Sequence, residues 1–369
     1  MEKKEIMKEQ GKSKRMKILL IAASVVVFFI IISSIYIYRA FHATNYPDGE
    51  PVVVTIPKGA SFSAIADLLY ENTVIENRFG FYLAGRLLGW EEQIQSGMFE
   101  VPPAKSNYEL LKDLRHGRLR KVFDVTIFEG FTVNQIAGQL QRRMGLDSTR
   151  VVQLATDSSI AARYGFEQGS LKGYLLPDRY RFFGDYTEED VIDIIVNEFW
   201  KFYNDSLQRR TEELDLSIYD VIIMASIVEG ETSLAPEKPT VAGLYYNRIR
   251  RRMPLQADAT VQYALSDEPP RRLMYRDYRV QSPYNTYLYR GLPPGPINNP
   301  GRNAILASLY PEEHNYLYMV TDGTGGHTFS ETYNQHLRAV RQFRQLRAER
   351  ERQRALEEEQ RKAAGSNEE

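Results

Sequence analysis

The chain has 369 residues, with 47 basic and 48 acidic side chains and a net charge of -1. At roughly 150 residues per domain, this length allows about two domains with hydrophobic cores. The balanced charge gives no overall attraction to nucleic acid, so no nucleic-acid partner is expected. The absence of cysteine excludes disulfides and thiolate chemistry, and the five histidines form no HExxH-like pair. We therefore expect neither a metal nor a cofactor.

Residues 18–38 form an uncharged run, ILLIAASVVVFFIIISSIYIY. At about 1.5 Å per residue, a helix over this run is about 32 Å long, close to the thickness of a bilayer core. The leader 1–17 has an excess of lysine and arginine, which predicts a cytoplasmic amino terminus. A cleaved signal peptide would have a shorter apolar region, and a buried core helix is the other alternative. We expect a single-pass anchor, a polar linker over 39–51 and an exported remainder.

An internal repeat follows the linker. Residues 54–69, VTIPKGASFSAIADLL, align without gaps on residues 125–140, VTIFEGFTVNQIAGQL. Each copy has β-favouring residues, a turn glycine (Gly59 or Gly130) and a small hydroxyl residue that can open an amphipathic helix. The pattern predicts two strand–turn–helix units, although a common pattern can also recur by chance.

The spacing of apolar residues predicts the other elements. Helices are expected over 78–90, 106–116, 147–168, 188–204, 216–229, 240–253 and 301–309, and strands within 96–103, 169–183 and 315–321. Strands and helices segregate without long βαβ alternation, so the fold class is α+β. Residues 345–369 are highly charged with almost nothing apolar, which predicts a solvated helix that frays into disorder.

The strongest chemical signal is a carboxylate at the end of an apolar helix, SIYDVIIMASIVEGET (217–232). Val221, Ala225 and Glu229 are spaced four residues apart, so Glu229 shares a helix face with apolar residues. Loss of solvation favours the protonated form that a general acid needs. The alternative is that Glu229 is simply the first exposed residue after a buried helix. Glu231 points roughly 200° away, so a structural hydrogen-bonding role is expected there.

The segment IVEGET and three later motifs together resemble the endolytic murein transglycosylases of the YceG-like family. The later motifs are NRIRRRMPLQADATVQYAL (247–265), SPYNTYLYRGLPPGPINNPG (282–301) and GTGGHTFSETYNQH (323–336). The resemblance implies a membrane anchor, a LysM-like module over 52–120 and a catalytic domain over 121–344. The charged tail 345–369 lies outside it.

The resemblance also implies a reaction and a location. Such an enzyme, anchored in the bacterial inner membrane, cuts the β-1,4 bond between N-acetylmuramic acid and N-acetylglucosamine in nascent peptidoglycan strands. It consumes no water, leaves 1,6-anhydro ends and terminates strand elongation beside the peptidoglycan synthases. Glu229 would be the catalytic acid and base. Two alternatives stay open: a hydrolase that uses Asp258 or Glu231 as second carboxylate, and a peptidoglycan-binding scaffold without catalysis.

Nine further residues are candidates for substrate binding: Asn247, Arg248, Gln256, Asp258, Tyr284, Asn285, Thr286, Tyr287 and His327. Each has a structural alternative. Asn247 and Arg248 could tie motifs together, Asp258 could cap a helix that starts near Ala259, and His327 could satisfy a local carbonyl instead of orienting Glu229. The Tyr284–Tyr287 segment precedes a proline-stiffened loop that could be a cleft wall or only a turn. Two positions depart from the family pattern: Lys172, where an acid is common, and Arg179, where a small hydroxyl residue is usual.

Overall fold

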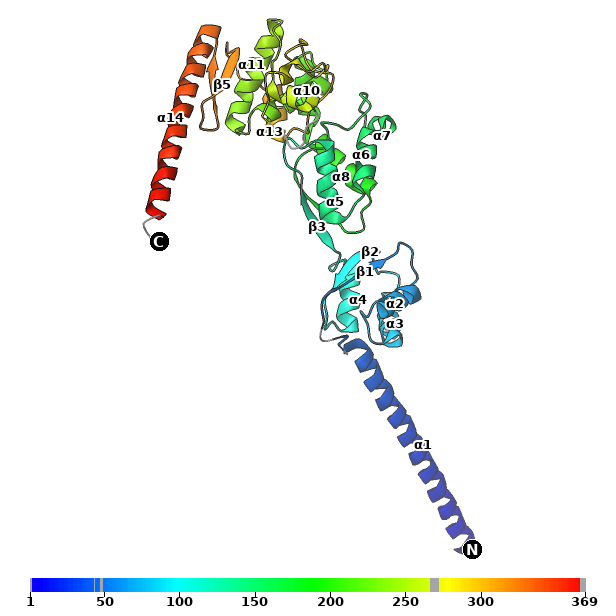
Figure 1. Ribbon diagram of the computed structural model, residues 1–369. Helices are drawn as coiled ribbons and strands as arrows, with labels where there is room; N and C mark the ends of the chain where they lie inside the picture. Colours follow the sequence, from blue (N-terminus) through cyan, green and yellow to red (C-terminus); the bar gives the residue numbers. More distant parts are fainter. Residues whose placement is uncertain (1, 43, 47–48, 266–271, 366–369) are drawn as a thin grey trace. The chain divides into compact units, whose positions relative to one another are not determined.

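The computed structural model describes residues 2–42, 44–46, 49–265 and 272–365 (Figure 1). The chain divides into two compact units, Met1–Phe123 with Phe182–Asp185, and Asp124–Arg181 with Tyr186–Glu369. Helices predominate, and the strands of the described residues form three two-stranded sheets. The fold therefore mixes helix and sheet, as expected.

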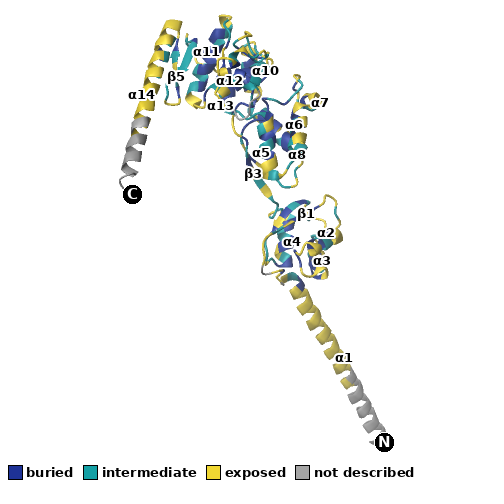
Figure 2. Cartoon of the chain, viewed as in Figure 1, coloured by how far each residue is buried: buried dark blue, intermediate teal, exposed yellow. Residues whose placement is uncertain are grey.

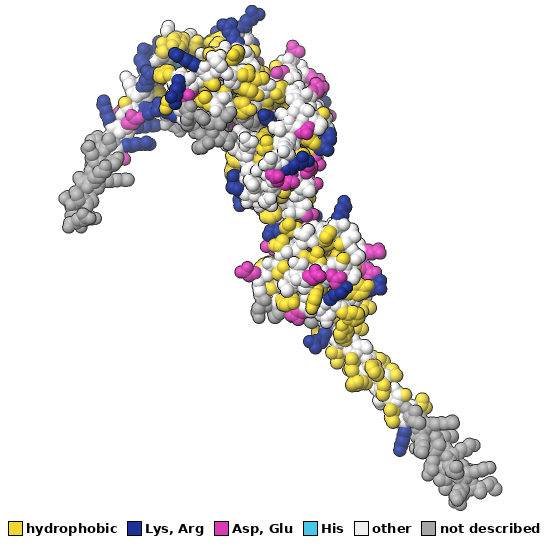
Figure 3. Space-filling view, turned by 45° about the vertical axis from the view of Figure 1, so that its right-hand side comes forward, with side chains coloured by type: hydrophobic (Ala, Val, Ile, Leu, Met, Phe, Trp, Pro, Cys, Tyr) yellow, Lys and Arg dark blue, Asp and Glu magenta, His cyan; other side chains and the backbone are white. Residues whose placement is uncertain are grey.

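Helix α1 (Glu2–His42) contains the predicted apolar run. Its stretch Leu19–His42 has a mean hydropathy of 2.7 and is long enough to cross a membrane. Figure 2 shows this part of α1 exposed, and Figure 3 shows hydrophobic side chains along it. Burial begins only at Ala40, whose carbonyl accepts a hydrogen bond from Asn107 Nδ2 at 2.8 Å. A helix this long, apolar and exposed is compatible with a single-pass anchor.

The remainder of the first unit is a small α/β module. Its elements are β1 (Val52–Ile56), α2 (Phe62–Glu71), α3 (Arg78–Leu88), β2 (Gly97–Val101) and α4 (Asn107–His116). Strands β1 and β2 pair antiparallel with Val54 opposite Phe99. Both residues belong to a core that the helices complete with side chains such as Leu69, Phe81 and Leu110.

Both copies of the repeat fold as the sequence predicts. Strand β1 leads through Gly59 to α2, and β3 (Val122–Thr126) leads through Gly130 to α5 (Val133–Met144). The two glycines have φ values of 78° and 77°, a left-handed conformation that disfavours other residues. Ser61 and Thr132 cap their helices by accepting a backbone N–H three residues on.

The second unit is built around α10 (Ile218–Glu231), whose residues from Val221 to Val228 are all buried. Helices α11 (Lys238–Arg250), α12 (Asp258–Leu265) and α13 (Arg302–Leu309) pack against it. The other elements are α6 (Ser148–Thr156), α7 (Ser158–Arg163), β4 (Arg179–Phe183), α8 (Glu188–Phe202), α9 (Asp205–Glu213), η1 (Ala235–Glu237), η2 (Asp277–Arg279), β5 (Tyr318–Thr321), β6 (His327–Ser330) and α14 (Tyr333–Gly365). A helix buried on all sides explains why apolar residues fill every face of α10.

Most expected elements are present, and α9, α12, β6 and the short turns η1 and η2 lie outside the expected ranges. Helix α9 has the largely polar sequence DSLQRRTEE, so it lacks a broad apolar stripe. Helix α12 corresponds to the helix starting near Ala259 that is the structural alternative for Asp258. Strand β6 pairs with β5, with Met319 opposite Phe329, whereas no strand is expected after residue 321. The helix expected over 147–168 is divided in two, because Asp157 ends α6 and caps α7.

A tight loop beside α10 is fixed by one buried asparagine. Asn299 Oδ1 accepts from the backbone N–H groups of Gly173, at 2.9 Å, and Leu175, at 3.1 Å. Gly173 has φ 86°, and a Cβ there would lie 2.5 Å from Ile222 Cγ2. The loop therefore needs glycine for its backbone conformation and for its packing.

Substitution of Gly173 should separate these two requirements. Gly173→Ala should destabilise the unit by about 3 kcal/mol, from left-handed strain plus overpacking. Gly165 has almost the same φ, 83°, but open space around it, so Gly165→Ala should carry only the strain, about 1 kcal/mol. Thermal unfolding of the full-length chain in detergent measures both. Equal melting temperatures for the two variants would contradict the packing argument.

Candidate active site

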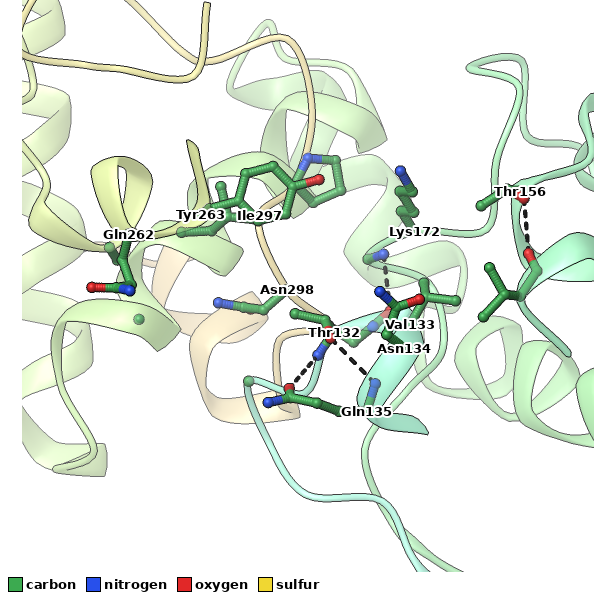
Figure 4. Close-up of a pocket in the computed structure, with 17 residues that line it drawn as sticks. Thr132, Val133, Asn134, Gln135, Thr156, Lys172, Gln262, Tyr263, Ile297 and Asn298 are labelled. Carbon is green, nitrogen blue, oxygen red and sulfur yellow. Dashed lines mark hydrogen bonds between the residues drawn. The ribbon is translucent and has the colours of Figure 1, made fainter. Parts of the chain in front are cut away.

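The second unit contains a cleft of about 600 Å³ (Figure 4). That volume lies in the range of small-molecule and saccharide-sized sites. Its walls are the start of α5, one side of α6, the Gly173 loop, the end of α10, one side of α12 and the segment 296–299. The lining residues are Gly130, Thr132, Val133, Asn134, Gln135, Val152, Thr156, Lys172, Gly173, Gly230, Ala259, Gln262, Tyr263, Pro296, Ile297, Asn298 and Asn299. Most of the polar groups are neutral amides and hydroxyls.

Glu229 lies in the last turn of α10, next to this cleft. Its side chain is 5% exposed, and both carboxylate oxygens accept from Lys238 Nζ, at 2.8 Å and 2.9 Å. The backbone N–H of Gly301 donates to Oε2 at 3.0 Å. Three donated hydrogen bonds therefore fix the orientation of the carboxylate.

One glycine lies between the Glu229 side chain and the cleft. Gly130 lines the cleft, and a Cβ at this position would lie 3.7 Å from Glu229 Cγ. With no side chain at Gly130, a ligand in the cleft can approach Glu229 closely. Gly230 also lines the cleft and allows α10 to pack closely on α12, because a Cβ there would lie 2.6 Å from the Cβ of Ala259.

Lys238 and Glu129 belong to this site but were missed in the sequence. The Lys238 side chain is 1% exposed, and its Nζ also lies 3.3 Å from Glu129 Oε2. The short 3₁₀ turn η1 reverses the chain after α10 and brings Lys238 back to Glu229. Glu129 stands where the first repeat copy has Lys58, so the reversed charge between the copies was the available signal.

Glu231 lies at the end of α10 and accepts from the backbone N–H of Ala259 at 3.3 Å and from the Tyr245 hydroxyl. Burial raises the pKa of Glu231 to about 7, although the hydrogen bond from Ala259 acts in the opposite direction. The contacts link α10 to α11 and α12, which is the hydrogen-bonding role expected for this residue.

Asn247 and Arg248 are buried, with polar groups bonded inside the protein. Asn247 Nδ2 donates to the carbonyl of His314 at 2.8 Å. Arg248 donates from Nε to the carbonyl of Leu317 and from Nη1 to that of Leu255, both at 2.7 Å. Of their two expected roles, the structure shows the one that ties motifs together.

Gln256 and Asp258 do not line the cleft. Gln256 Oε1 accepts from Arg248 at 3.3 Å. Asp258 is the first residue of α12 and accepts from the hydroxyls of Tyr287, at 2.6 Å, and Tyr278, at 3.3 Å. Asp258 therefore forms a hydrogen-bonded pair with Tyr287.

The Tyr284–Tyr287 segment does not line the cleft but contacts one of its lining residues. Asn285 and Thr286 are buried; Asn285 Nδ2 donates to the carbonyl of Val280 at 2.9 Å, and Thr286 Oγ1 accepts from Ala257 N at 3.0 Å. The Tyr284 ring lies 4.7 Å from that of Tyr263, which lines the cleft. Burial raises the pKa of Tyr284 to about 12, so its hydroxyl stays neutral.

His327 contacts Glu237 instead of Glu229. Its Nδ1 lies 2.9 Å from Glu237 Oε2, and its backbone N–H donates to Glu237 Oε1 at 2.9 Å. This pair joins β6 to the turn η1 that precedes Lys238. Across the described ranges, no group of three His, Cys, Asp or Glu side chains could hold a metal ion.

Two amides of the cleft were missed in the sequence. Gln262 Nε2 and Asn298 Oδ1 are buried polar atoms without a hydrogen-bond partner among the described residues. Asn298 Nδ2 donates to the carbonyl of Ser226 at 2.8 Å, which fixes Oδ1 as the open acceptor. Unpaired buried polar groups are unfavourable by about 1–3 kcal/mol each, so a ligand that pairs with them gains affinity.

The pKa of Glu231 predicts a pH-dependent stability. In the folded protein the pKa of Glu231 is about 7, against 4.5 for an ordinary glutamate. The contribution of Glu231 to the free energy of unfolding is therefore complete below pH 4.5 and is lost as the pH rises to 7. Glu231→Gln should remove a decline on the order of 3 kcal/mol over this window. Melting temperatures of the full-length chain between pH 4 and 8 measure it. Exposed Glu212 on α9 supplies the control, Glu212→Gln, and parallel curves for wild type and Glu231→Gln would refute the assignment.

Comparisons with known proteins agree on one family. The model of the YceG-like family matches residues 54–342. An endolytic murein transglycosylase of Bacillus subtilis (strain 168) is 29% identical over 307 residues, which cover 79% of this chain and 84% of that protein. An endolytic murein transglycosylase of Streptococcus pneumoniae (strain ATCC BAA-255 / R6) is 29% identical over 308 residues, which cover 75% of this chain and 55% of that protein. A crystal structure of a YceG-like protein from Listeria monocytogenes shares 30% identity with a TM-score of 0.55, and the match covers 78% of this chain and 98% of that one. The chain belongs to the YceG-like family.

Proposed function

We propose that this protein is an endolytic murein transglycosylase whose single acid/base is Glu229. The observation that carries the proposal is a carboxylate held by Lys238 and Gly301 next to Gly130, a residue without a side chain that lines the cleft. The relatives from Bacillus subtilis and Streptococcus pneumoniae bear the same functional name. The substrate class is therefore peptidoglycan glycan strands.

In the first step Glu229 acts as an acid. It gives its proton to the oxygen of the β-1,4 bond as the bond from that oxygen to C1 of N-acetylmuramic acid breaks. The N-acetylglucosamine fragment leaves as an alcohol. Positive charge at C1 is stabilised by the 2-acetamido group of the substrate and by the Glu229 carboxylate now formed.

In the second step the carboxylate acts as a base. It takes the proton from the C6 hydroxyl of the muramic residue while O6 bonds to C1. The product is a 1,6-anhydro end, and Glu229 is again protonated, so no water is consumed. A usual glycosidase needs two carboxylates, whereas here the substrate supplies the nucleophile and one carboxylate is sufficient.

Lys238 is proposed as a positioning residue. Its ammonium group donates to both oxygens of Glu229 and so fixes the orientation of the side chain for both steps.

The cleft offers groups suited to sugars. Tyr263 can stack on a pyranose ring, and the open atoms of Gln262 and Asn298 match the carbonyl and N–H of an acetamido group. These residues replace Gln256 as the candidates for acetamido binding. Tyr284 would act through its contact with Tyr263.

The location of the enzyme follows from helix α1 and the charge of its leader. We infer that α1 anchors the protein in the bacterial cell membrane with its amino terminus in the cytoplasm and its catalytic domain (121–344) outside. The module over 52–120 would be LysM-like and would bind glycan or hold the active site away from the membrane. Such an anchored enzyme would meet strands as the synthases extend them.

One observation favours a second candidate function, a two-carboxylate hydrolase. Glu129 and Glu229 both lie within 3.3 Å of Lys238 Nζ, so their nearest oxygens are at most about 6 Å apart. This upper limit is compatible with the roughly 5–5.5 Å between the two carboxyl groups of retaining glycosidases. Glu129 is a better second carboxylate than Asp258 or Glu231, whose oxygens are bonded elsewhere.

The reaction is tested by Glu229→Gln, which keeps the shape of the side chain but removes the acid. Full-length enzyme in detergent is incubated with un-crosslinked glycan strands, and the ends are identified by mass spectrometry. We expect wild type to release 1,6-anhydro ends and Glu229→Gln to be slower by a factor of about 10²–10⁴.

The matched control is Glu212→Gln, the same change on the exposed face of α9, which should keep full activity. Reducing muramic ends from wild type, lost in Glu129→Gln, would identify the hydrolase. Unchanged cleavage by Glu229→Gln would refute the catalytic role, and glycan binding without cleavage by wild type would indicate a scaffold.

The positioning role of Lys238 predicts a separation of kcat from KM. Lys238→Met should lower kcat by about 10²-fold with little change in KM, because the carboxylate loses its orientation while the cleft is kept. Removal of one partner of a buried pair is also destabilising by about 3–5 kcal/mol. Lys238→Arg, which keeps the charge, should restore folding and part of kcat. An effect confined to KM would assign Lys238 to substrate binding instead.

A further inference from the structure

Among the described residues that line the cleft, Lys172 is the one that carries a charge. It is partly exposed, and its ammonium group makes no hydrogen bond or ion pair with any residue of the described ranges. Figure 4 shows it at the cleft with Tyr263, Ile297 and Asn298. A cation without a partner in an otherwise neutral cleft attracts an anionic group of the ligand.

The backbone of Lys172 is tied to the site that holds Glu229. Gly173 N donates to Asn299 Oδ1 at 2.9 Å, and Gly130 N donates to the Asn299 carbonyl at 3.0 Å. Two residues after Asn299, Gly301 donates its N–H to Glu229. The same short segment therefore fixes the backbone at Lys172 and the reactive carboxylate, so a group bound to Lys172 has a defined place relative to the bond that is cut.

Peptidoglycan supplies anionic groups close to its sugar chain. The lactyl ether of muramic acid ends in a carboxylate when no peptide is attached, and a peptide stem attached there brings carboxylates of its own. Both sources offer the same chemistry to an ammonium group. The sugar hydroxyls and acetamido groups are neutral and match the amides of the cleft.

We propose that Lys172 binds a carboxylate carried by the lactyl ether of the glycan strand, and so makes the enzyme selective for anionic over neutralised strands. This inference rests on the proposed function and names the substrate group that the same cleft recognises. It is also specific to this chain, because an acidic residue is common in the family at the position of Lys172.

The experiment compares three substrates with the full-length enzyme in detergent. The first is un-crosslinked strands with peptide stems, the second is the same strands after amidase removal of the stems, and the third is stem-bearing strands with their carboxylates converted to amides. Wild type should have a KM about tenfold lower for a carboxylate-bearing strand than for the amidated one. The carboxylate-bearing substrate with the lower KM identifies the source, stem or lactyl group.

Three variants test the residue. Lys172→Gln should raise KM for the preferred strand to the value for the amidated strand without changing kcat, and Lys172→Glu should raise it further. Neither should change KM for the amidated strand. Lys201→Gln, the same change at an exposed lysine of α8, should behave as wild type.

The outcomes separate the inference from the proposed function. Equal KM values for all three substrates in wild type, or a Lys172→Glu variant with an unchanged preference, would overturn the role of Lys172 while 1,6-anhydro products still support the reaction. Absence of 1,6-anhydro ends from every substrate would instead overturn the proposed function.

Discussion

The contact between the Lys238 ammonium group and both oxygens of Glu229 is the constraint on which the site depends. Both side chains are almost completely buried, at 1% and 5% exposure. Burial of two charges is favourable only when good geometry and further hydrogen bonds compensate for lost hydration. Here Gly301 and Glu129 supply the additional contacts. The pair therefore holds together the end of α10, the start of α11 and the segment before α13.

The internal repeat connects the fold to the site. Its two copies share strand, left-handed glycine and capped helix, but only the second contributes to the cleft, through Gly130 and the first turn of α5. The glycine that the turn needs for its backbone also leaves open the approach to Glu229. At the preceding position, Lys58 of one copy corresponds to Glu129 of the other. One backbone pattern thus serves a supporting module and the candidate active site.

Local signals in the sequence predicted much of the fold, because caps, glycines and apolar spacing act over a few residues. Glu229 was found in the same way, as a carboxylate that ends an apolar helix. Lys238 was not, since its role depends on the reversal of the chain at η1, which no spacing indicates. Gln262 and Asn298 line the same cleft but come from distant segments, and only the structure reveals their unpaired atoms. Asn285 and Thr286 show the opposite case. Their motif made them candidates for substrate binding, but both side chains are buried and hydrogen-bonded to backbone groups.

The hydrogen bonds to Glu229 also have a stereochemical consequence. Oε2 receives two donors, Lys238 and Gly301, while Oε1 receives Lys238 alone. A carboxylate oxygen has about two lone-pair directions, so Oε1 keeps one direction free for a substrate. In the proposed reaction a single atom would then release the proton and later collect another. One oxygen can serve both steps because the departing glycosidic oxygen and O6 of a 1,6-anhydro ring both lie on the β face of the muramic sugar.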